Sequence, residues 1–130
     1  MENTRFFIDY KALHAIFILI FALLPSISSA DELNVYSGRK AALIKPLLQQ
    51  FQKETGIKIN LVTAKADALI KRIESEGEST PADILITVDA GRLDRAKKMD
   101  LFHTINSSSI SAEVPSYYID KDNQWVGLSK

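Results

Sequence analysis

The sequence contains no cysteine among its 130 residues. This absence excludes disulfide bonds, thiolate metal sites and thiol nucleophiles. Lysine plus arginine number 16 and aspartate plus glutamate also number 16, so the chain carries no net charge at neutral pH. A balanced charge gives no field that would attract nucleic acid or an acidic membrane surface. We therefore expect no nucleic-acid partner.

Catalytic signatures are also missing. The sequence has no HExxH, GxSxG, GxGxxG or Walker motif, so nothing assembles a hydrolase or nucleotide site. His14 lies in an apolar N-terminal run, and His103 follows Leu101-Phe102, where we expect a surface residue rather than a metal ligand. Because no nucleophile or general base stands out, we expect that the protein is not an enzyme.

Only one long apolar run is present, from Ala12 to Leu24, and a histidine interrupts it. It is shorter than the roughly 20 residues that a membrane-spanning helix needs. A weakly positive N-terminus precedes this run, and small residues follow it at Ser28 and Ala30. This is the pattern of a secretory signal peptide. We predict that residues 1–30 are a signal peptide cleaved after Ala30, and that the mature chain is periplasmic because no second apolar span follows.

Beyond the predicted cleavage site, short apolar runs alternate with amphipathic helical stretches. Period-two and period-3.6 patterns predict strands at 33–36, 57–62 and 82–88, another strand beginning at 124, and helices at 41–54, 66–76 and 89–99. The serine-rich stretch 106–116 is expected to be irregular. Alternation with such short connections predicts right-handed crossovers and a parallel sheet covered by helices on both faces. The fold class is therefore α/β.

Ligands of such sheets bind at the carboxyl ends of the strands. In the loop 36–40, a glycine turn opens onto a helix N-terminus, where unpaired N–H groups and a partial positive charge favour anions. The hydroxyls of Tyr36 and Ser37 and the guanidinium of Arg39 would complete an oxyanion or carboxylate site. The alternative is an ordinary strand–helix turn with a solvated arginine.

Two further loops fall at the same edge, at 63–65 and 89–91. From them we expect Lys65 and Asp89 to line the cleft. The remaining charges on the second predicted helix are interpreted as its solvated face; they are Lys71, Arg72, Glu74 and Glu76.

An ordered series of segments runs along the chain: Asn34–Lys40, Phe51–Ile59, Lys65–Leu69, Ser75–Gly77 and Pro81–Leu85. This series closely resembles the start of the periplasmic ferric-iron-binding proteins, the substrate-binding components of iron ABC transporters. The resemblance implies a type II periplasmic binding protein fold, with two α/β lobes and ferric ion in the cleft between them. It also implies that residues 31–130 are the N-terminal part of the first lobe, an incomplete parallel-sheet unit from a truncated protein.

The resemblance further implies Fe³⁺ held with a synergistic anion such as carbonate, and Arg39 as a residue that holds this anion. Most tyrosine ligands of the family lie later than this chain extends, and some relatives carry His-Tyr where this sequence has Lys40-Ala41. The pair Tyr117-Tyr118 lies in a different segment and is expected to pack in a loop or face solvent. We therefore assign no metal ligand in this chain and expect it not to bind Fe³⁺ tightly by itself.

The expected partners are ferric ion and an ABC transporter permease, and the protein is expected to be a monomer. Two alternatives stay open at this point. The chain could be a small exported α/β enzyme or flavodoxin-like module, or it could bind another metal or an oxyanion, because a shared scaffold does not fix the ligand.

Overall fold

The computed structural model describes residues 31–127. Its centre is a three-stranded parallel sheet in the order β2-β1-β3, formed by β1 (Glu32–Ser37), β2 (Lys58–Thr63) and β3 (Ile84–Ile86). The predicted parallel α/β architecture is confirmed. The predicted signal peptide at 1–30 lies outside the described residues.

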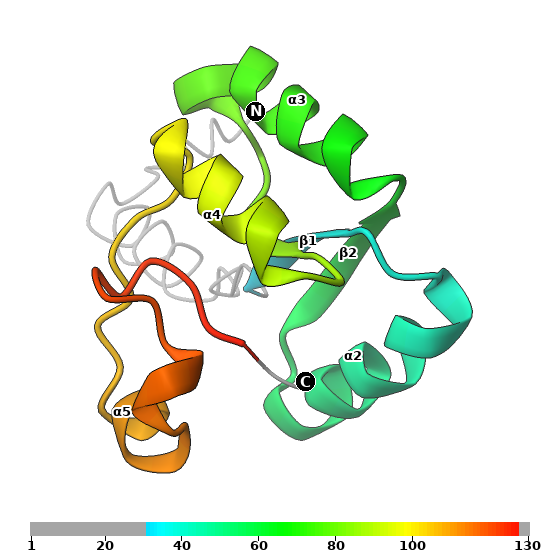
Figure 1. The fold of residues 1–130 in the computed structure, drawn as a ribbon. Helices are drawn as coiled ribbons and strands as arrows, with labels where there is room; N and C mark the ends of the chain where they lie inside the picture. Colours follow the sequence, from blue (N-terminus) through cyan, green and yellow to red (C-terminus); the bar gives the residue numbers. More distant parts are fainter. Residues whose placement is uncertain (1–30, 128–130) are drawn as a thin grey trace, which may run out of the picture.

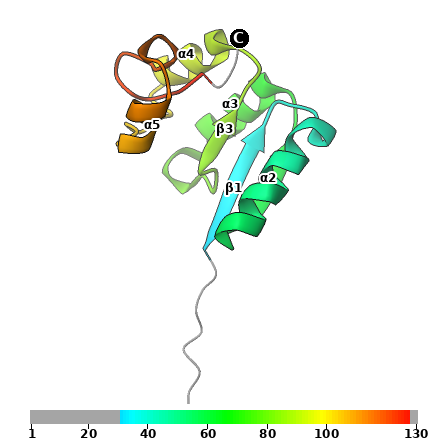
Figure 2. The same cartoon turned by 90° about the horizontal axis from the view of Figure 1, so that it is seen from below.

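Helices cover both faces of this sheet. The helix α2 (Ala41–Thr55) lies on one side, and α3 (Ala66–Glu76) lies on the other, next to α4 (Ala90–Lys98) (Figures 1 and 2). The helix α2 ends at its C-cap residue, Gly56, whose N–H donates a hydrogen bond to the Gln52 carbonyl. Gly56 has a φ of 76°, a left-handed conformation that glycine adopts without strain. No helix of the described residues is long and apolar enough to cross a membrane.

The core lies mainly between β1 and α3. Successive strand residues point to opposite faces, so Val35 and Tyr36 are both buried but on different sides of the sheet. Tyr36 packs with Leu69 and Ile73 of α3 in one cluster. Its hydroxyl lies 3.4 Å from both carboxylate oxygens of Glu76.

Two residues predicted to be solvated therefore flank this core. The Arg72 guanidinium lies 4.9 Å from the centre of the Tyr36 ring and bonds to Glu76, whose carboxylate also accepts a hydrogen bond from Thr80. The interpretation of these charges as a solvated face agrees with the exposed Arg72, whereas Glu76 is half-buried. The long arginine stem reaches over the tyrosine while its charged end stays accessible to water.

The last part of the described chain departs from the sequence prediction. Residues expected to be irregular include α5 (Ser108–Glu113), which begins because the Ser107 Oγ accepts a hydrogen bond from the Ile110 N–H at 3.3 Å. The strand predicted to begin at 124 is reduced, within the described residues, to an isolated antiparallel bridge between Ile119 and Val126.

A half-buried ion pair joins this last segment to α4. The Lys97 Nζ lies 2.7 Å from both carboxylate oxygens of Asp120 and 2.6 Å from Asp122. Burial raises the pKa of Asp120, but hydrogen bonds from Lys97 and from the Gln124 and Asp122 backbone N–H groups outweigh it, so the pKa lies below its ordinary value.

This lowered pKa predicts a loss of stability in acid. A carboxylate with a depressed folded pKa stabilises the protein above its unfolded pKa, near 3.9, and this contribution disappears as the pH falls through the folded pKa. We expect Asp120→Asn to be less stable than wild type at pH 7 and to approach wild type below about pH 4. Urea unfolding at a series of pH values, followed by Trp125 fluorescence, measures this.

The matched control for that series is Asp100→Asn, because Asp100 is an exposed carboxylate in the turn after α4. It should keep the wild-type pH profile. Parallel stability curves for Asp120→Asn and wild type across the acid range would show that the Asp120 carboxylate makes no pH-dependent contribution.

Candidate anion-binding edge of the sheet

The loops that follow the three strands gather at one edge of the sheet, as their parallel order predicts. The first two are in direct contact, because the Ala64 N–H donates to the Ser37 carbonyl at 3.3 Å. Gly38 also approaches the start of α3 so closely that a Cβ added to it would lie 2.9 Å from the Ala66 Cβ. A glycine at this position therefore allows the first loop to pack against the α3 N-terminus.

The turn at the end of β1 uses its own N–H groups internally. The Gly38 N–H donates to the Ile86 carbonyl at 2.7 Å, and the Arg39 N–H donates to the buried Ser37 Oγ at 3.1 Å. Unpaired N–H groups were expected at this turn, and that expectation was wrong for these two residues. The Ser37 hydroxyl instead shapes the turn so that the exposed Arg39 projects from the edge.

The unpaired N–H groups lie further along the chain, in the first turns of α2 and α3. Lys40 and Lys65 occupy the N-cap positions of α2 and α3, and neither helix has a side-chain cap. The first N–H groups of each helix therefore remain available, with the positive end of the helix dipole. Arg39, Lys40 and Lys65 are all exposed beside them. Two uncapped helix starts with three basic side chains favour an anionic ligand.

Tyr36 does not belong to this group. It is 1% exposed and its hydroxyl lies against Glu76, at the far end of α3 from the loops. A neighbouring carboxylate repels an anion, so the expectation that the Tyr36 hydroxyl joins Ser37 and Arg39 at an anion site is not supported by the geometry. The strand alternation turns this side chain into the core, and the sequence pattern alone did not show which face that was.

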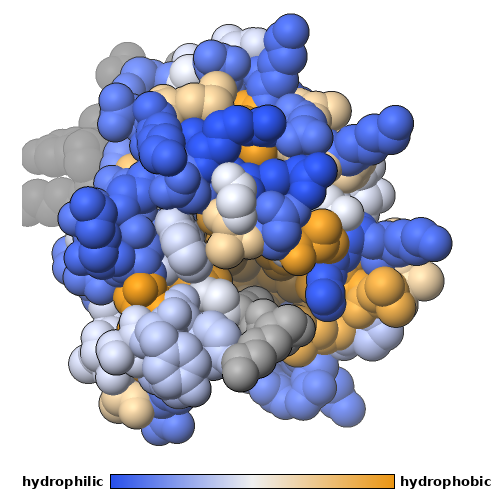
Figure 3. Space-filling view, viewed as in Figure 1, coloured by the Kyte–Doolittle hydropathy of each residue, from blue (hydrophilic) through white to orange (hydrophobic). Residues whose placement is uncertain are grey.

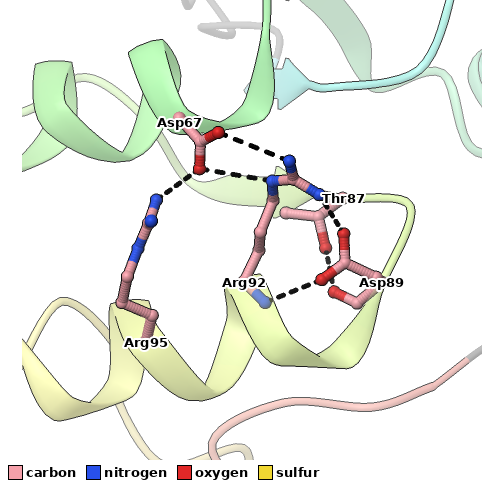
Figure 4. Close-up of polar contacts among 5 residues, drawn as sticks. All are labelled: Asp67, Thr87, Asp89, Arg92 and Arg95. Carbon is pink, nitrogen blue, oxygen red and sulfur yellow. Dashed lines mark hydrogen bonds and ion pairs between the residues drawn. The ribbon is translucent and has the colours of Figure 1, made fainter.

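Asp89 lies at the same edge but its carboxylate is engaged (Figure 4). It caps α4 by accepting from the Arg92 N–H at 2.9 Å, and it also pairs with the Arg92 guanidinium. The Arg92 N–H and then its side chain hold the pKa of Asp89 below its usual value. The expected cleft-lining residue is thus also the residue that begins α4.

Arg92 connects this cap to α3. Its Nε and Nη2 lie 3.2 and 3.3 Å from the Asp67 carboxylate, which also bonds to Arg95 (Figure 4). Hydrogen bonds from Arg92 and then Arg95 lower the pKa of Asp67. Sequence reasoning missed this cluster, although the spacing of Asp89 and Arg92 is that of a helix cap and its third residue. The cluster fixes the starts of α3 and α4 relative to each other and compensates the charge of Asp67.

No group of three or more histidine, cysteine or acidic residues that could hold a metal ion occurs in residues 31–127. Tyr117 is 76% exposed, and its ring centre lies 4.5 Å from that of Tyr118. His103 is exposed as well.

Comparison with known proteins identifies relatives of this chain. A family model described as "Bacterial extracellular solute-binding protein" matches residues 36–129. Iron uptake protein A1 of Synechocystis is 43% identical over 100 residues, which are 77% of this chain and 28% of that protein. Iron uptake protein A2 of the same organism is 37% identical over 132 residues, covering 100% of this chain and 36% of that protein.

Solved structures match the fold. The apo ferric ion-binding protein A of Pasteurella haemolytica superposes with a TM-score of 0.72 at 43% identity, over 77% of this chain and 31% of that one. A Trichodesmium protein in complex with iron and citrate ligands superposes with a TM-score of 0.70 at 41% identity, over 74% and 30%. The expected fold class, part of a periplasmic binding protein, is confirmed.

The chain spans about a third of the length of the curated relatives it matches, 28% and 36% of the two Synechocystis proteins. The resemblance that the ordered sequence segments indicated is confirmed by these matches. The family model, which covers more than half of the chain, gives the family: this chain belongs to the bacterial extracellular solute-binding proteins.

Proposed function

We propose that this chain is the N-terminal part of a ferric-iron receptor that serves an ABC-type importer. The observation that carries the proposal is the basic edge formed by two uncapped helix starts and three exposed basic side chains. The names of the relatives support ferric iron as the ligand, since these relatives are called iron uptake and ferric iron-binding proteins. Membership of the extracellular solute-binding proteins supports a solute-binding role.

The chain's own part in this function is to hold an anion beside the metal. Ferric ion is a hard cation that prefers oxygen ligands, and a carbonate or a citrate carboxylate can fill coordination positions that protein side chains leave open. Arg39 would donate two parallel N–H bonds to such an anion, and the first N–H groups of α2 would add to them. Ser37 orients the turn, and Lys65 and Asp89 lie at the rim.

We expect no tight iron binding by this chain alone. Lys40-Ala41 stand where the resemblance allows His-Tyr, and residues 31–127 hold no group of three or more histidine, cysteine or acidic residues that could bind a metal. We therefore expect ferric citrate titration of the chain alone to give no strong tyrosinate-to-iron absorption. A stoichiometric coloured complex that survives a competing chelator would contradict this, and Tyr117→Phe would then identify the ligand.

The anion site is tested in a fusion of this chain to the remaining sequence of Synechocystis iron uptake protein A1. We expect the fusion to bind Fe³⁺ together with carbonate or citrate. Arg39→Ala should weaken iron binding roughly ten- to a hundred-fold when the anion is present, the effect of one charge-assisted contact. Arg39→Lys should restore little of the lost iron affinity, because a lysine ammonium group cannot form two parallel N–H bonds to the anion.

The matched control is Lys53→Ala, which removes an exposed charge near the other end of α2. Its affinity should equal that of the unmodified fusion at every carbonate concentration. If Arg39→Ala behaved in the same way as Lys53→Ala, Arg39 would be a solvated residue after a turn. If sulfate or phosphate bound in an Arg39-dependent manner but Fe³⁺ did not, the protein would be an oxyanion receptor.

Export is a separate part of the proposal. We propose a periplasmic location, in keeping with a relative named "Fe(3+)-binding periplasmic protein". Expressed in a Gram-negative host, the chain should be cut between Ala30 and Asp31, because Ser28 and Ala30 satisfy the small-residue rule. Mass spectrometry of the periplasmic fraction measures the N-terminus. An intact Met1 terminus on membrane-bound protein would overturn this assignment, and Ala30→Phe should block cleavage.

A further inference from the structure

A carboxylate lies in the first turn of α3, beside one of the two helix starts of the anion edge. Asp67 is the second residue of this helix. The Ala68 and Leu69 N–H groups both donate to the Lys65 carbonyl, at 2.9 and 3.1 Å. The two N–H groups before them, of Ala66 and Asp67, have no partner within the helix. The positive end of the helix dipole attracts a first-turn carboxylate. Asp67 is therefore an internal competitor of any anion at this helix start.

Two arginines of α4 hold this carboxylate. The Asp67 Oδ1 accepts from the Arg92 Nε at 3.2 Å and also from Arg95, and its Oδ2 accepts from the Arg92 Nη2 at 3.3 Å. Figure 4 shows both arginines reaching Asp67 from the neighbouring helix. Among the described residues, the hydrogen bonds to this carboxylate come from these two side chains, so Asp67 is drawn toward α4.

The second acidic residue of the edge is held by the same arginine. The Arg92 guanidinium pairs with Asp89 as well as with Asp67. The Arg92 N–H and guanidinium lower the pKa of Asp89, and the negative charge of Asp67 opposes this, so the two carboxylates are close enough to repel each other. In the space-filling view, hydrophilic side chains cover much of the surface where α3 and α4 lie (Figure 3). Two arginines thus balance two carboxylates at the edge.

We propose that Arg92 and Arg95 are positioning residues of the anion edge, which hold the Asp67 carboxylate against α4 and so keep the start of α3 open to an external anion. Neither arginine contacts the ligand. Without them, Asp67 would turn to its own helix start, where its oxygens compete for the free N–H groups and its charge repels a carbonate or a citrate carboxylate. The inference rests on the proposed function, because it concerns the anion of the same edge.

The exposure of these side chains argues against a mainly structural role. Arg92 is 37% exposed, Arg95 52% and Asp67 54%. Ion pairs between side chains this accessible contribute little to stability, because water and salt screen them. We therefore expect replacement of the arginines to change the melting temperature by a few degrees at most, and to change the anion affinity more clearly.

The test uses the fusion with the remaining sequence of Synechocystis iron uptake protein A1, titrated with citrate and with bicarbonate in the absence of iron. Arg92→Gln/Arg95→Gln should bind them roughly three- to ten-fold more weakly, the effect of one charge at a helix N-terminus. Adding Asp67→Ala to this variant should restore most of the affinity. Asp67→Ala alone should bind at least as tightly as the unmodified fusion. The matched control is Lys71→Gln/Lys98→Gln, which removes two exposed basic charges from the same two helices and should leave the affinity nearly unchanged.

Hydrogen exchange at the Ala66 and Asp67 amides gives a second measurement, which needs no ligand. It should slow in Arg92→Gln/Arg95→Gln, because the released carboxylate then accepts from these amides. Unchanged exchange would overturn the inference.

The titrations separate the remaining outcomes. A loss of affinity that Asp67→Ala fails to restore would make the arginines ligands or structural residues, and would overturn the inference. Equal affinities in all variants, or a fusion that binds Fe³⁺ but neither anion, would overturn it as well. If the anion affinities follow the expected pattern and the fusion does not bind Fe³⁺, only the proposed function is contradicted.

Discussion

Leu69→Ala is expected to lower the free energy of unfolding by about 2–5 kcal/mol, the usual cost of truncating a buried leucine. Leu69 is 2% exposed and packs with Tyr36 and Ile73, so its removal takes apolar area from the core and leaves a cavity between α3 and β1. For a unit of about 100 residues this corresponds to a fall in melting temperature of roughly 10 °C or more. Urea and thermal unfolding followed by circular dichroism measure it.

The same substitution at Leu47 is the control. Leu47 also lies on a helix but is 57% exposed, and in the chain alone its side chain faces solvent. Leu47→Ala should change the free energy of unfolding by less than about 0.5 kcal/mol. Similar losses for both variants would mean that the core does not lie between α3 and β1.

Gly38→Ala is expected to destabilise the protein by about 1–3 kcal/mol, although alanine is a small residue. The added Cβ would lie 2.9 Å from the Ala66 Cβ and 3.3 Å from the Ala66 Cα, a contact that only a backbone shift relieves. The shift would separate the first loop from the start of α3. Arg39 and the α3 N-terminus would then move apart, so we expect a lower affinity for the anion as well as a lower stability.

Two variants isolate the contact from general effects of glycine. Gly91→Ala, inside α4, meets only Asp89 Oδ1 at 3.4 Å and should be neutral or stabilising by up to about 1 kcal/mol. In a double-mutant cycle, Ala66→Gly should recover part of the loss caused by Gly38→Ala, because it removes the atom in conflict. Strictly additive free energies would show that the two residues do not interact.

The sequence carried enough local information to predict the main elements. The apolar period of the stretch before Gly77 identified α3 at 66–76, and a glycine cap ended α2 close to the predicted residue. Short connections between strands and helices allowed only right-handed crossovers, so the parallel order followed. Those elements in turn located the carboxyl edge, where Ser37, Arg39, Lys65 and Asp89 all lie.

Other features depended on contacts between residues distant in the sequence. A strand was predicted at 82–88, but the observed strand β3 covers only Ile84–Ile86, because only these residues pair with β1. The helix α5 begins at a serine cap within a stretch whose composition resembles a loop. Amino-acid composition indicates only the average secondary-structure tendency of a stretch, whereas a helix N-cap depends on one hydrogen bond made by one residue.

Alone, the sequence determined the α/β class, the order of elements and the edge at which the parallel strands end, because hydrophobic period and connection length are local properties. Only the tertiary structure decided the use of each side chain at that edge. It turned Tyr36 into the core and engaged Asp89 with Arg92. The reason is physical: which face of a strand is buried, and which charges meet, depends on how the elements pack against each other.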